Sequence, residues 1–456
     1  MRGDPMRAVT RRAALLGGVG LALSGCDSVT DTFDRWFGES KVPLRGDRKP
    51  VLATERGLGV DEGFDRAVTL PPATAMPNWP QAGGVPSHAP GHPALGPGLR
   101  QLWSRSAGTG GAYRRRLVGP PVLADGTLFV ADAVGRVTAM DAASGRERWS
   151  FDSRPEDDRQ GALGAGLAHE GGVLYVVTGL AEAMALDAAT GAPGWRVPLP
   201  APARGAPTVA GGRLFVPTIE NHLVALSAAN GDKLWTHRAQ PVTTMMLGLP
   251  APAVEGEVVV AGFASGELVA LRAQDGKLSW SEALSSSRGG GMADIAAITA
   301  LPVIDRGRVF AAGLGGLAIS IDLRSGRRLW ERDVAVAETP WVAGDWLFLV
   351  TSDANLACIG REDGRVRWAS ALARYGNPAK RRDPITWGPP VVAGGRILIA
   401  GSHERLLELS PADGSTLSET RLPSGATLAP AVAGGILYVL TDGGDVVAFQ
   451  GSGPAA

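Results

Sequence analysis

One phrase recurs along this chain, and its recurrence limits the fold more than any other feature does. GRVTAMDAASGRERW at residues 135–149 returns in altered form as EAMALDAATGAPGW, HLVALSAANGDKLW, ELVALRAQDGKLSW and LAISIDLRSGRRLW. The tryptophans that end successive repeats are 46, 40, 45, 50 and 38 residues apart: Trp149, Trp195, Trp235, Trp280, Trp330 and Trp368. Internal repeats of about 40–50 residues are typical of the blades of a β-propeller.

Each repeat has the pattern of a four-stranded antiparallel sheet. A two-residue turn such as Gly171-Gly172 or Gly434-Gly435 precedes an alternating apolar segment such as VLYVVT or ILYVLT, which predicts hairpins of half-buried strands. A third strand carries the phrase A-x-D-x-x-[ST]-G, and a fourth carries the tryptophan. Because one such sheet cannot bury both faces alone, we expect blades to pack face to face, with the tryptophans supplying apolar area between them.

The turn in the repeated phrase has its own requirements. We expect Gly145 to adopt a left-handed conformation that a side chain would penalise, and Asp141 to accept hydrogen bonds from the turn amides. The equivalent glycines of seven repeats are Gly145, Gly191, Gly231, Gly276, Gly326, Gly364 and Gly414.

The number of repeats predicts eight blades, and the incomplete last repeat predicts how the ring closes. The eighth repeat begins at Pro430 and ends in DVVAFQGSGPAA without a fourth strand, whereas Trp103 in LRQLWSRSA stands alone before the first full repeat. We therefore expect residues near 100–106 to complete the last blade. The predicted fold is all-β: an eight-bladed β-propeller of four-stranded antiparallel blades over residues 99–456, closed by an N-terminal strand in the last blade.

The first 25 residues have the features of an export signal. Basic residues Arg7, Arg11 and Arg12 precede the apolar run ALLGGVGLAL, which is too short to span a bilayer, and LSGC follows. Leu23–Cys26 resembles the bacterial lipobox, which implies lipidation of Cys26. An ordinary signal peptide with a chance cysteine is the alternative, and the Sec and twin-arginine routes, like starts at Met1 and Met6, stay open.

Residues 26–98 have no sustained period and are rich in Pro, Gly and Ala, as in TLPPATAMPNWPQAGG and VPSHAPGHPALGPG. We predict a flexible tether that holds the propeller clear of a membrane. His88 and His92 lie in this stretch with a spacing that can bind metal on a helix. Pro90 and Gly91 lie between the two histidines and disfavour a helix there, so no metal site is predicted.

Several function classes are disfavoured by composition and by motifs. Lys and Arg number 45, as do Asp and Glu, and this balance argues against a nucleic-acid partner. Cys358 occupies the place of Ala139 in the first repeat, so we expect a small buried core residue and not a nucleophile. The sequence has no C-x-x-C-H, no G-x-x-x-x-G-K-[ST] and no G-x-S-x-G.

The phrase A-x-D-x-x-[ST]-G-x-x-x-W resembles the tryptophan-docking motif of eight-bladed quinoprotein propellers, the PQQ-like repeat family, over about residues 100–450. Quinoprotein dehydrogenases of this family carry a vicinal disulfide over the cofactor, and this sequence has no adjacent cysteines. The resemblance therefore points to the family's non-enzymatic branch, without cofactor or metal.

An exported, lipid-anchored propeller of this kind is similar to the BamB family of lipoproteins, which assemble β-barrel proteins in the outer membrane. The resemblance implies a scaffold at the periplasmic side of the outer membrane. Its partners would be the POTRA domains of BamA, the other Bam subunits and, as a further candidate, unfolded outer-membrane proteins. Carried over by motif, the partner-binding residues would be Leu199, Arg204, Gly205 and Asp294. The alternatives are a periplasmic PQQ-dependent dehydrogenase and a general protein-binding propeller with another envelope partner.

Overall fold

The computed structural model describes residues 58–112, 115–155, 164–242, 248–284 and 297–453. The chain divides into two units, residues 1–54 and 55–456, and the described residues all belong to the second unit. The predicted signal peptide and Cys26 therefore lie outside the described residues. The described ranges contain strands and no α-helix, and so no helix there could cross a membrane.

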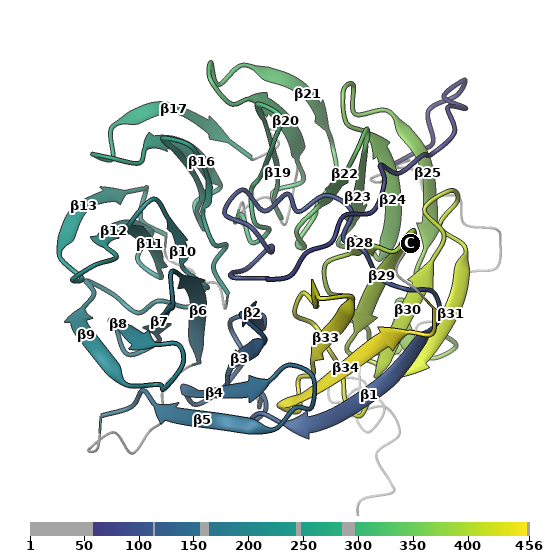
Figure 1. The fold of residues 1–456 in the computed structure, drawn as a ribbon. Coiled ribbons are helices and arrows are strands. Elements are labelled where there is room, and N and C mark those ends of the chain that lie inside the picture. The colour runs from purple at the N-terminus through teal and green to yellow at the C-terminus, as the bar shows by residue number, and fades with distance from the viewer. Residues whose placement is uncertain (1–57, 113–114, 156–163, 243–247, 285–296, 454–456) are drawn as a thin grey trace, which may run out of the picture. The chain divides into compact units, whose positions relative to one another are not determined.

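Eight four-stranded antiparallel sheets are arranged in a ring (Figure 1). The first four are blade 1, β2 (Val122–Ala124), β3 (Thr127–Ala131), β4 (Arg136–Asp141) and β5 (Glu147–Asp152); blade 2, β6 (Ala165–Glu170), β7 (Val173–Thr178), β8 (Glu182–Asp187) and β9 (Pro193–Pro198); blade 3, β10 (Thr208–Ala210), β11 (Arg213–Thr218), β12 (His222–Ser227) and β13 (Lys233–Arg238); and blade 4, β14 (Ala253–Glu255), β15 (Val258–Gly262), β16 (Glu267–Arg272) and β17 (Leu278–Ala283).

The remaining blades continue in chain order. They are blade 5, β18 (Val303–Asp305), β19 (Arg308–Ala312), β20 (Ala318–Asp322) and β21 (Arg328–Arg332); blade 6, β22 (Trp341–Ala343), β23 (Trp346–Val350), β24 (Asn355–Gly360) and β25 (Val366–Ala371); blade 7, β28 (Val391–Ala393), β29 (Arg396–Gly401), β30 (Arg405–Leu409) and β31 (Thr416–Arg421); and blade 8, β32 (Ala431–Ala433), β33 (Ile436–Leu440), β34 (Asp445–Gly451) and β1 (Leu99–Ser106). A separate hairpin, β26 (Tyr375–Asn377) and β27 (Arg382–Pro384), lies between blades 6 and 7.

The ring closes as the repeats predict. The N-terminal strand β1 pairs antiparallel with β34, the last strand of the chain, and places Trp103 opposite Ala448. The two ends of the propeller are thereby joined by hydrogen bonds within one sheet, blade 8. The predicted eight-bladed β-propeller and its N-terminal closing strand are confirmed.

The tryptophans of the repeat pack between blades, each against the turn glycine of the next blade. Gly276 of blade 4 has φ +69°, and a Cβ placed there would lie 2.7 Å from the Trp235 ring. The indole Nε1 of Trp235 also donates to the Ala273 carbonyl at 3.0 Å. The other pairs, tryptophan first, are Trp103–Gly145, Trp149–Gly191, Trp195–Gly231, Trp280–Gly326, Trp330–Gly364 and Trp368–Gly414. The glycine is required twice, by its positive φ and by the indole that covers it.

The aspartate of the phrase has the predicted role in the turn. The Asp141 carboxylate accepts from the Ser144 amide at 2.9 Å and from the Ser144 hydroxyl at 2.7 Å. The pKa of Asp141 is lowered to about 2, because its carboxylate is bonded by Arg148 and then by Ser144.

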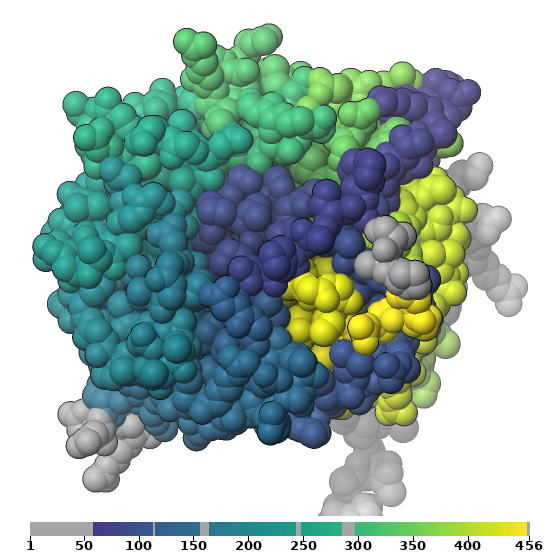
Figure 2. All heavy atoms as spheres, viewed as in Figure 1, coloured from purple at the N-terminus to yellow at the C-terminus, as the bar shows by residue number. Residues whose placement is uncertain are grey.

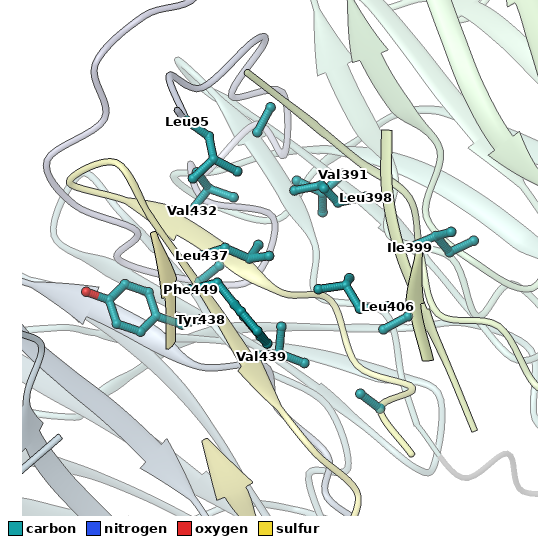
Figure 3. Packing of buried hydrophobic residues seen from close by; sticks show 14 of the residues in the cluster. Leu95, Val391, Leu398, Ile399, Leu406, Val432, Leu437, Tyr438, Val439 and Phe449 are labelled. Atoms are coloured by element: carbon teal, nitrogen blue, oxygen red, sulfur yellow. The ribbon is translucent and has the colours of Figure 1, made fainter. Parts of the chain in front are cut away.

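The predicted tether is wrong for residues 58–98. This segment, drawn in dark purple in Figures 1 and 2, crosses one face of the ring and covers its centre. Trp79 is only 1% exposed, and Leu95 is buried in a core cluster with side chains of blades 7 and 8 (Figure 3). The segment lacks a strand period because it pairs with several blades in turn instead of joining one sheet. Residues 26–57 lie outside the described ranges.

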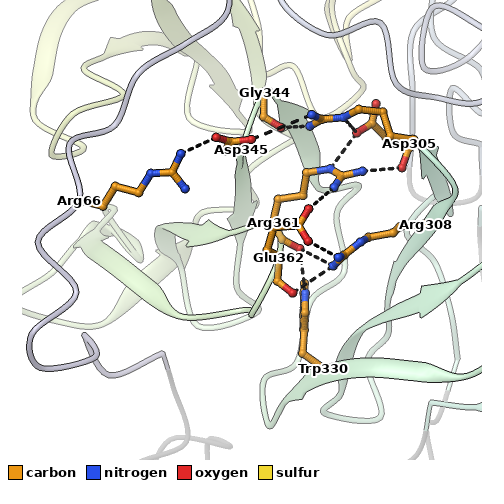
Figure 4. A network of polar contacts seen from close by, with 9 residues as sticks. Arg66, Asp305, Arg308, Trp330, Gly344, Asp345, Arg361 and Glu362 are labelled. Carbon is orange, nitrogen blue, oxygen red and sulfur yellow. Dashed lines mark hydrogen bonds and ion pairs between the residues drawn. The ribbon is translucent and has the colours of Figure 1, made fainter.

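A polar network fixes the first part of this segment to blade 6 (Figure 4). Arg66 pairs with Asp345 in the first hairpin of blade 6. The buried Arg361 donates to Asp305 of blade 5 at 2.9 Å, and Trp330 Nε1 donates to the Arg361 carbonyl at 3.0 Å.

Elsewhere in blade 6, Cys358 is fully buried, as predicted, and burial raises the pKa of its thiol.

Candidate partner-binding surface

The ring has two different faces. One carries the hairpins between the first two strands of each blade, such as Gly171-Gly172, and is crossed by the N-terminal segment. The opposite face carries the loops that enter each inner strand from the preceding blade. The predicted partner-binding residues 199–205 belong to one of these loops, between β9 and β10.

Backbone hydrogen bonds hold this loop against three blades. Its amides reach the strand-end hairpin of blade 2, and its carbonyls accept from blade 3 and from the loop that enters blade 4. The bonds are Leu199 N to Ala181 O at 2.7 Å, Ala203 N to Thr178 O at 3.1 Å, Ile219 N to Pro202 O at 3.0 Å and Leu249 N to Arg204 O at 2.9 Å. A loop bonded in this way presents its side chains in a defined position, as a docking site requires.

Leu199 and Gly205 support the loop from inside. Leu199 is 7% exposed and packs in a core cluster with Ala203 and Leu214. A Cβ on Gly205 would overlap the Leu249 carbonyl oxygen, and a Cβ on Gly166 of blade 2 would overlap the Gly205 carbonyl oxygen. Gly205 is therefore needed for close backbone approach, and Leu199 is not at the surface.

Arg204 is the residue of this loop with an available charge. It is half-buried, and its Nε is enclosed without a hydrogen-bond partner. Within the described ranges its guanidinium has no carboxylate partner. Because Nε is enclosed, a docking partner could bond only with the exposed part of this half-buried side chain. Asp294, the acidic residue predicted beside it, lies outside the described residues.

Glu338 occupies the place of Gly205 in the loop that enters blade 6, two residues before the proline that precedes the inner strand. Desolvation by the surrounding protein raises the pKa of Glu338 to about 8. Sequence reasoning missed this residue. The signal was an acid at a position where other blades have a small residue, such as Gly205, Ala300 or Gly388.

The described ranges contain no group of three or more His, Cys, Asp or Glu side chains that could hold a metal ion. The histidines 88 and 92 are buried and are bonded separately. His88 Nδ1 lies 2.7 Å from the Pro302 carbonyl oxygen, whereas His92 Nδ1 lies 2.7 Å from that of Pro71. Both side chains have structural partners in the propeller.

Comparison with known proteins decides between the branches of the propeller family. The family model described as outer membrane protein assembly factor BamB matches residues 97–161, 135–370 and 371–453. The chain belongs to the BamB family. The Yersinia pestis outer membrane protein assembly factor BamB is 27% identical over 357 residues, which cover 76% of this chain and 88% of that protein. The Escherichia coli BamB is 26% identical over 353 residues, covering 75% and 87%.

Solved structures show the same fold. The crystal structure of Moraxella catarrhalis BamB has a TM-score of 0.66 at 20% identity and covers 77% of this chain and 100% of that chain. The quinohemoprotein alcohol dehydrogenase of Comamonas testosteroni also has a TM-score of 0.66, at 15% identity, covering 84% and 82%. At these identities the structural likeness establishes the propeller alone, and the family assignment depends on the sequence matches.

Proposed function

We propose that this protein is a non-enzymatic scaffold of the Bam complex, which binds the POTRA domains of BamA and aids the assembly of β-barrel proteins into the outer membrane. It would be anchored through lipidated Cys26, with the propeller facing the periplasm. The family match across residues 97–453 carries this proposal. The loop of Arg204 supports it, because a rigid loop holds a cation that has no carboxylate partner in the described part of the chain.

A forked, charge-assisted pair is the contact that suits Arg204. A guanidinium presents parallel N–H donors to a carboxylate, and such bonds contribute about 1.5–3 kcal/mol. The Asp294 loop would provide a second contact, with the opposite charge. The other Bam subunits are further partners in this proposal, and unfolded outer-membrane proteins are a further candidate.

Capture of BamA from detergent extracts by the full-length protein tests the proposal. Arg204→Glu should weaken capture by at least about tenfold, since a repulsive contact replaces a pair of that strength. Arg213→Glu is the matched control: Arg213 begins β11 of blade 3, on the face opposite the Arg204 loop, and its guanidinium donates to the Gly211 carbonyl at 3.3 Å. Both variants should melt within a few degrees of the parent.

The pattern across the two variants is decisive. Loss of capture in Arg204→Glu alone, with an unchanged melt, supports the docking role. Equal capture by the two variants would remove the Arg204 loop from the interface, and failure of the parent protein to capture BamA would remove the proposed partner.

A further inference from the structure

The segment from Thr74 to Ala94, here called the axial segment, is a closed loop at the centre of the ring. Its two ends are joined, because the Thr74 amide donates to His92 O and the Ala94 amide donates to Thr74 O, both at 2.8 Å. Figures 1 and 2 show it over the middle of the hairpin face.

The axial segment accepts a hydrogen bond from every blade. In each blade the donor lies in the inner strand or directly after it, and the acceptor is an oxygen of the axial segment. From blade 1 to blade 8 the bonds are Leu123 N to Trp79 O (2.8 Å), His169 N to Pro80 O (2.7 Å), Val209 N to Gln81 Oε1 (3.0 Å), Val254 N to Pro86 O (2.8 Å), Ile304 N to Ser87 O (2.8 Å), Trp341 Nε1 to Gly91 O (2.8 Å), Gly394 N to Pro93 O (3.0 Å) and Gly434 N to Met76 O (2.7 Å).

These donors form a site because of how a propeller is built. The inner strand of each blade has one edge paired within the blade and one edge turned to the axis, where its amides have no partner in the sheet. Eight such edges surround the axis and need acceptors. The axial segment supplies acceptors to amides of seven of these edges and to the Trp341 indole of blade 6, in the manner of strand addition at a sheet edge.

The composition of the axial segment fits this donor-rich environment. It has no Asp, Glu, Lys or Arg, and it contains five prolines and three glycines. Proline has a carbonyl acceptor but no N–H, so it can be pressed against donors without burying an unpaired donor of its own. The absence of charge avoids the cost of burying an ion.

Side chains hold the axial segment in one position. Trp79 stacks on Trp341 of blade 6, with centroids 6.2 Å apart and planes within 10°. His92 Nε2 accepts from the Gly395 amide at 2.8 Å, so its proton is on Nδ1, which donates to Pro71 O. These contacts, together with the buried His88, make the segment part of the ring's core at this end.

We propose that the hairpin-face end of the axis is a peptide-binding site for an uncharged, Pro- and Gly-rich extended chain, and that residues 74–94 occupy it in cis. Occupied in this way, the site withholds eight inner-strand edges from any other extended peptide. Partners are therefore left to the opposite face.

Hydrogen exchange of the full-length protein tests the occupancy directly. The backbone amides of Leu123, His169, Val209, Val254, Ile304 and Gly434 have the axial segment as their acceptor, so they should exchange at least about 100-fold more slowly than free amides. Exchange of these amides at the free rate in the unmodified protein would overturn the proposal without any variant.

A matched glycine pair tests release of the segment. Gly394 and Gly171 occupy the same hairpin position in blades 7 and 2, with φ +54° and +59°. A Cβ on Gly394 would overlap the Leu95 carbonyl oxygen, whereas a Cβ on Gly171 has nothing within 4 Å. Both alanine variants bear similar backbone strain, and only Gly394→Ala pushes against the N-terminal segment at the end of the axial loop.

In Gly394→Ala the six amides should lose at least about tenfold of their protection together, and Gly171→Ala should retain it. A synthetic peptide of residues 74–94, which lacks Leu95 and therefore its clash with the new Cβ, should then bind Gly394→Ala and restore protection, and should bind neither Gly171→Ala nor the parent. Loss confined to blade 7, or no restoration by the peptide, would overturn a single peptide site. If Gly394→Ala does not fold, Gln81→Ala replaces it: protection should be lost at Val209, and retained protection there would contradict the assigned acceptor.

Discussion

Seven of the contacts between neighbouring blades are made in one way, and the eighth, between blades 7 and 8, is made in another. In the seven, an indole covers the turn glycine of the next blade, and its Nε1 donates to a carbonyl of that turn at 2.8–3.2 Å. Blade 7 has Ser418 where the others have tryptophan, and Glu408 opposite it where the others have a small residue.

At the eighth contact a buried ion pair takes the place of the indole. Glu408, 3% exposed, pairs with Arg396 at 3.1 Å, and Arg396 donates to the Gly96 carbonyl at 2.7 Å. Gly96 lies beside Gly451, where the two ends of the propeller meet. A Cβ on Gly451 would overlap the Gly96 backbone, and a Cβ on Gly96 would overlap the Gly453 carbonyl oxygen.

The difference shows that each contact between blades needs a hydrogen-bond donor and a buried side chain that fills the space between them. The residue types that meet these two needs can differ from one contact to another. In seven cases an indole N–H of one blade reaches a carbonyl at the turn of the next, and in the eighth an Arg396 N–H reaches the Gly96 carbonyl, just before β1. Blade 8 has no continuous turn, because its last two strands come from opposite ends of the propeller. A tryptophan of blade 7 would therefore have no turn to pack against. Arg396, whose side chain is long enough to reach the segment before β1, donates the hydrogen bond instead. Burial lowers the pKa of Arg396, which marks the cost of this solution.

The largest effect is expected at an ordinary contact. Trp235→Ala removes the indole between blades 3 and 4 and should lower the free energy of unfolding by about 5 kcal/mol, because a buried aromatic is lost and a cavity remains. Urea denaturation measures this, with Leu234→Ala as the control. Leu234 is 46% exposed, so its truncation should change stability by less than about 0.5 kcal/mol. Similar losses in both variants would mean that burial against the next blade is not what the tryptophan provides.

The eighth contact should respond differently to single and double changes. Glu408→Ala leaves the Arg396 charge buried without its partner and should cost about 4 kcal/mol, whereas Arg396→Met combined with Glu408→Leu should be close to neutral. The same urea measurement compares them. A double variant as unstable as the single one would show that the ion pair, and not the filling of space, holds blade 7 to blade 8.

Most of the fold could be predicted because its information is local and repeated. The turn pattern, the alternating strands and the tryptophan–glycine contacts lie within one repeat or between adjacent ones, and Trp103 stood out as a strand without a blade. The axial segment could not be predicted, because its bonds go to eight strands distant in sequence and leave no period. The Arg396–Glu408 pair was equally invisible, since it occurs once and replaces the repeated residues.

The candidate site could be predicted less well. Arg204 lies on a loop of the face that the N-terminal segment leaves free, half-buried rather than projecting. Leu199, expected to contact a partner, is buried because the loop turns its apolar side into blade 3. Gly205 is explained by backbone crowding alone. Asp294 and Cys26 stay predictions.

The last prediction uses pH to distinguish the stability contributed by the axial segment from that contributed by the tryptophan contacts between blades. Indoles do not titrate, whereas burial lowers the pKa of His88 from 6.5 to about 4, opposed by its bond to Pro302. Between pH 6.5 and pH 4 the His88 side chain is protonated in the unfolded chain but neutral in the folded protein. The free energy of unfolding should therefore fall as pH decreases from about 6.5 to about 4, by about 3 kcal/mol for this group.

His88→Asn should reduce this loss, and asparagine tolerates the residue's φ of +60°. Burial also lowers the pKa of His169, His222, His237 and His403, so part of the pH dependence should persist in the variant. Asp141, whose pKa is lowered to about 2 mainly by Arg148, stabilises the turn above the ordinary pKa of 3.8, and its contribution is lost only below that pH. Urea denaturation between pH 4 and 8 measures the difference between parent and variant. Parallel curves would show that His88 is protonated without strain, and the axial segment would then be less firmly enclosed than the contacts between blades.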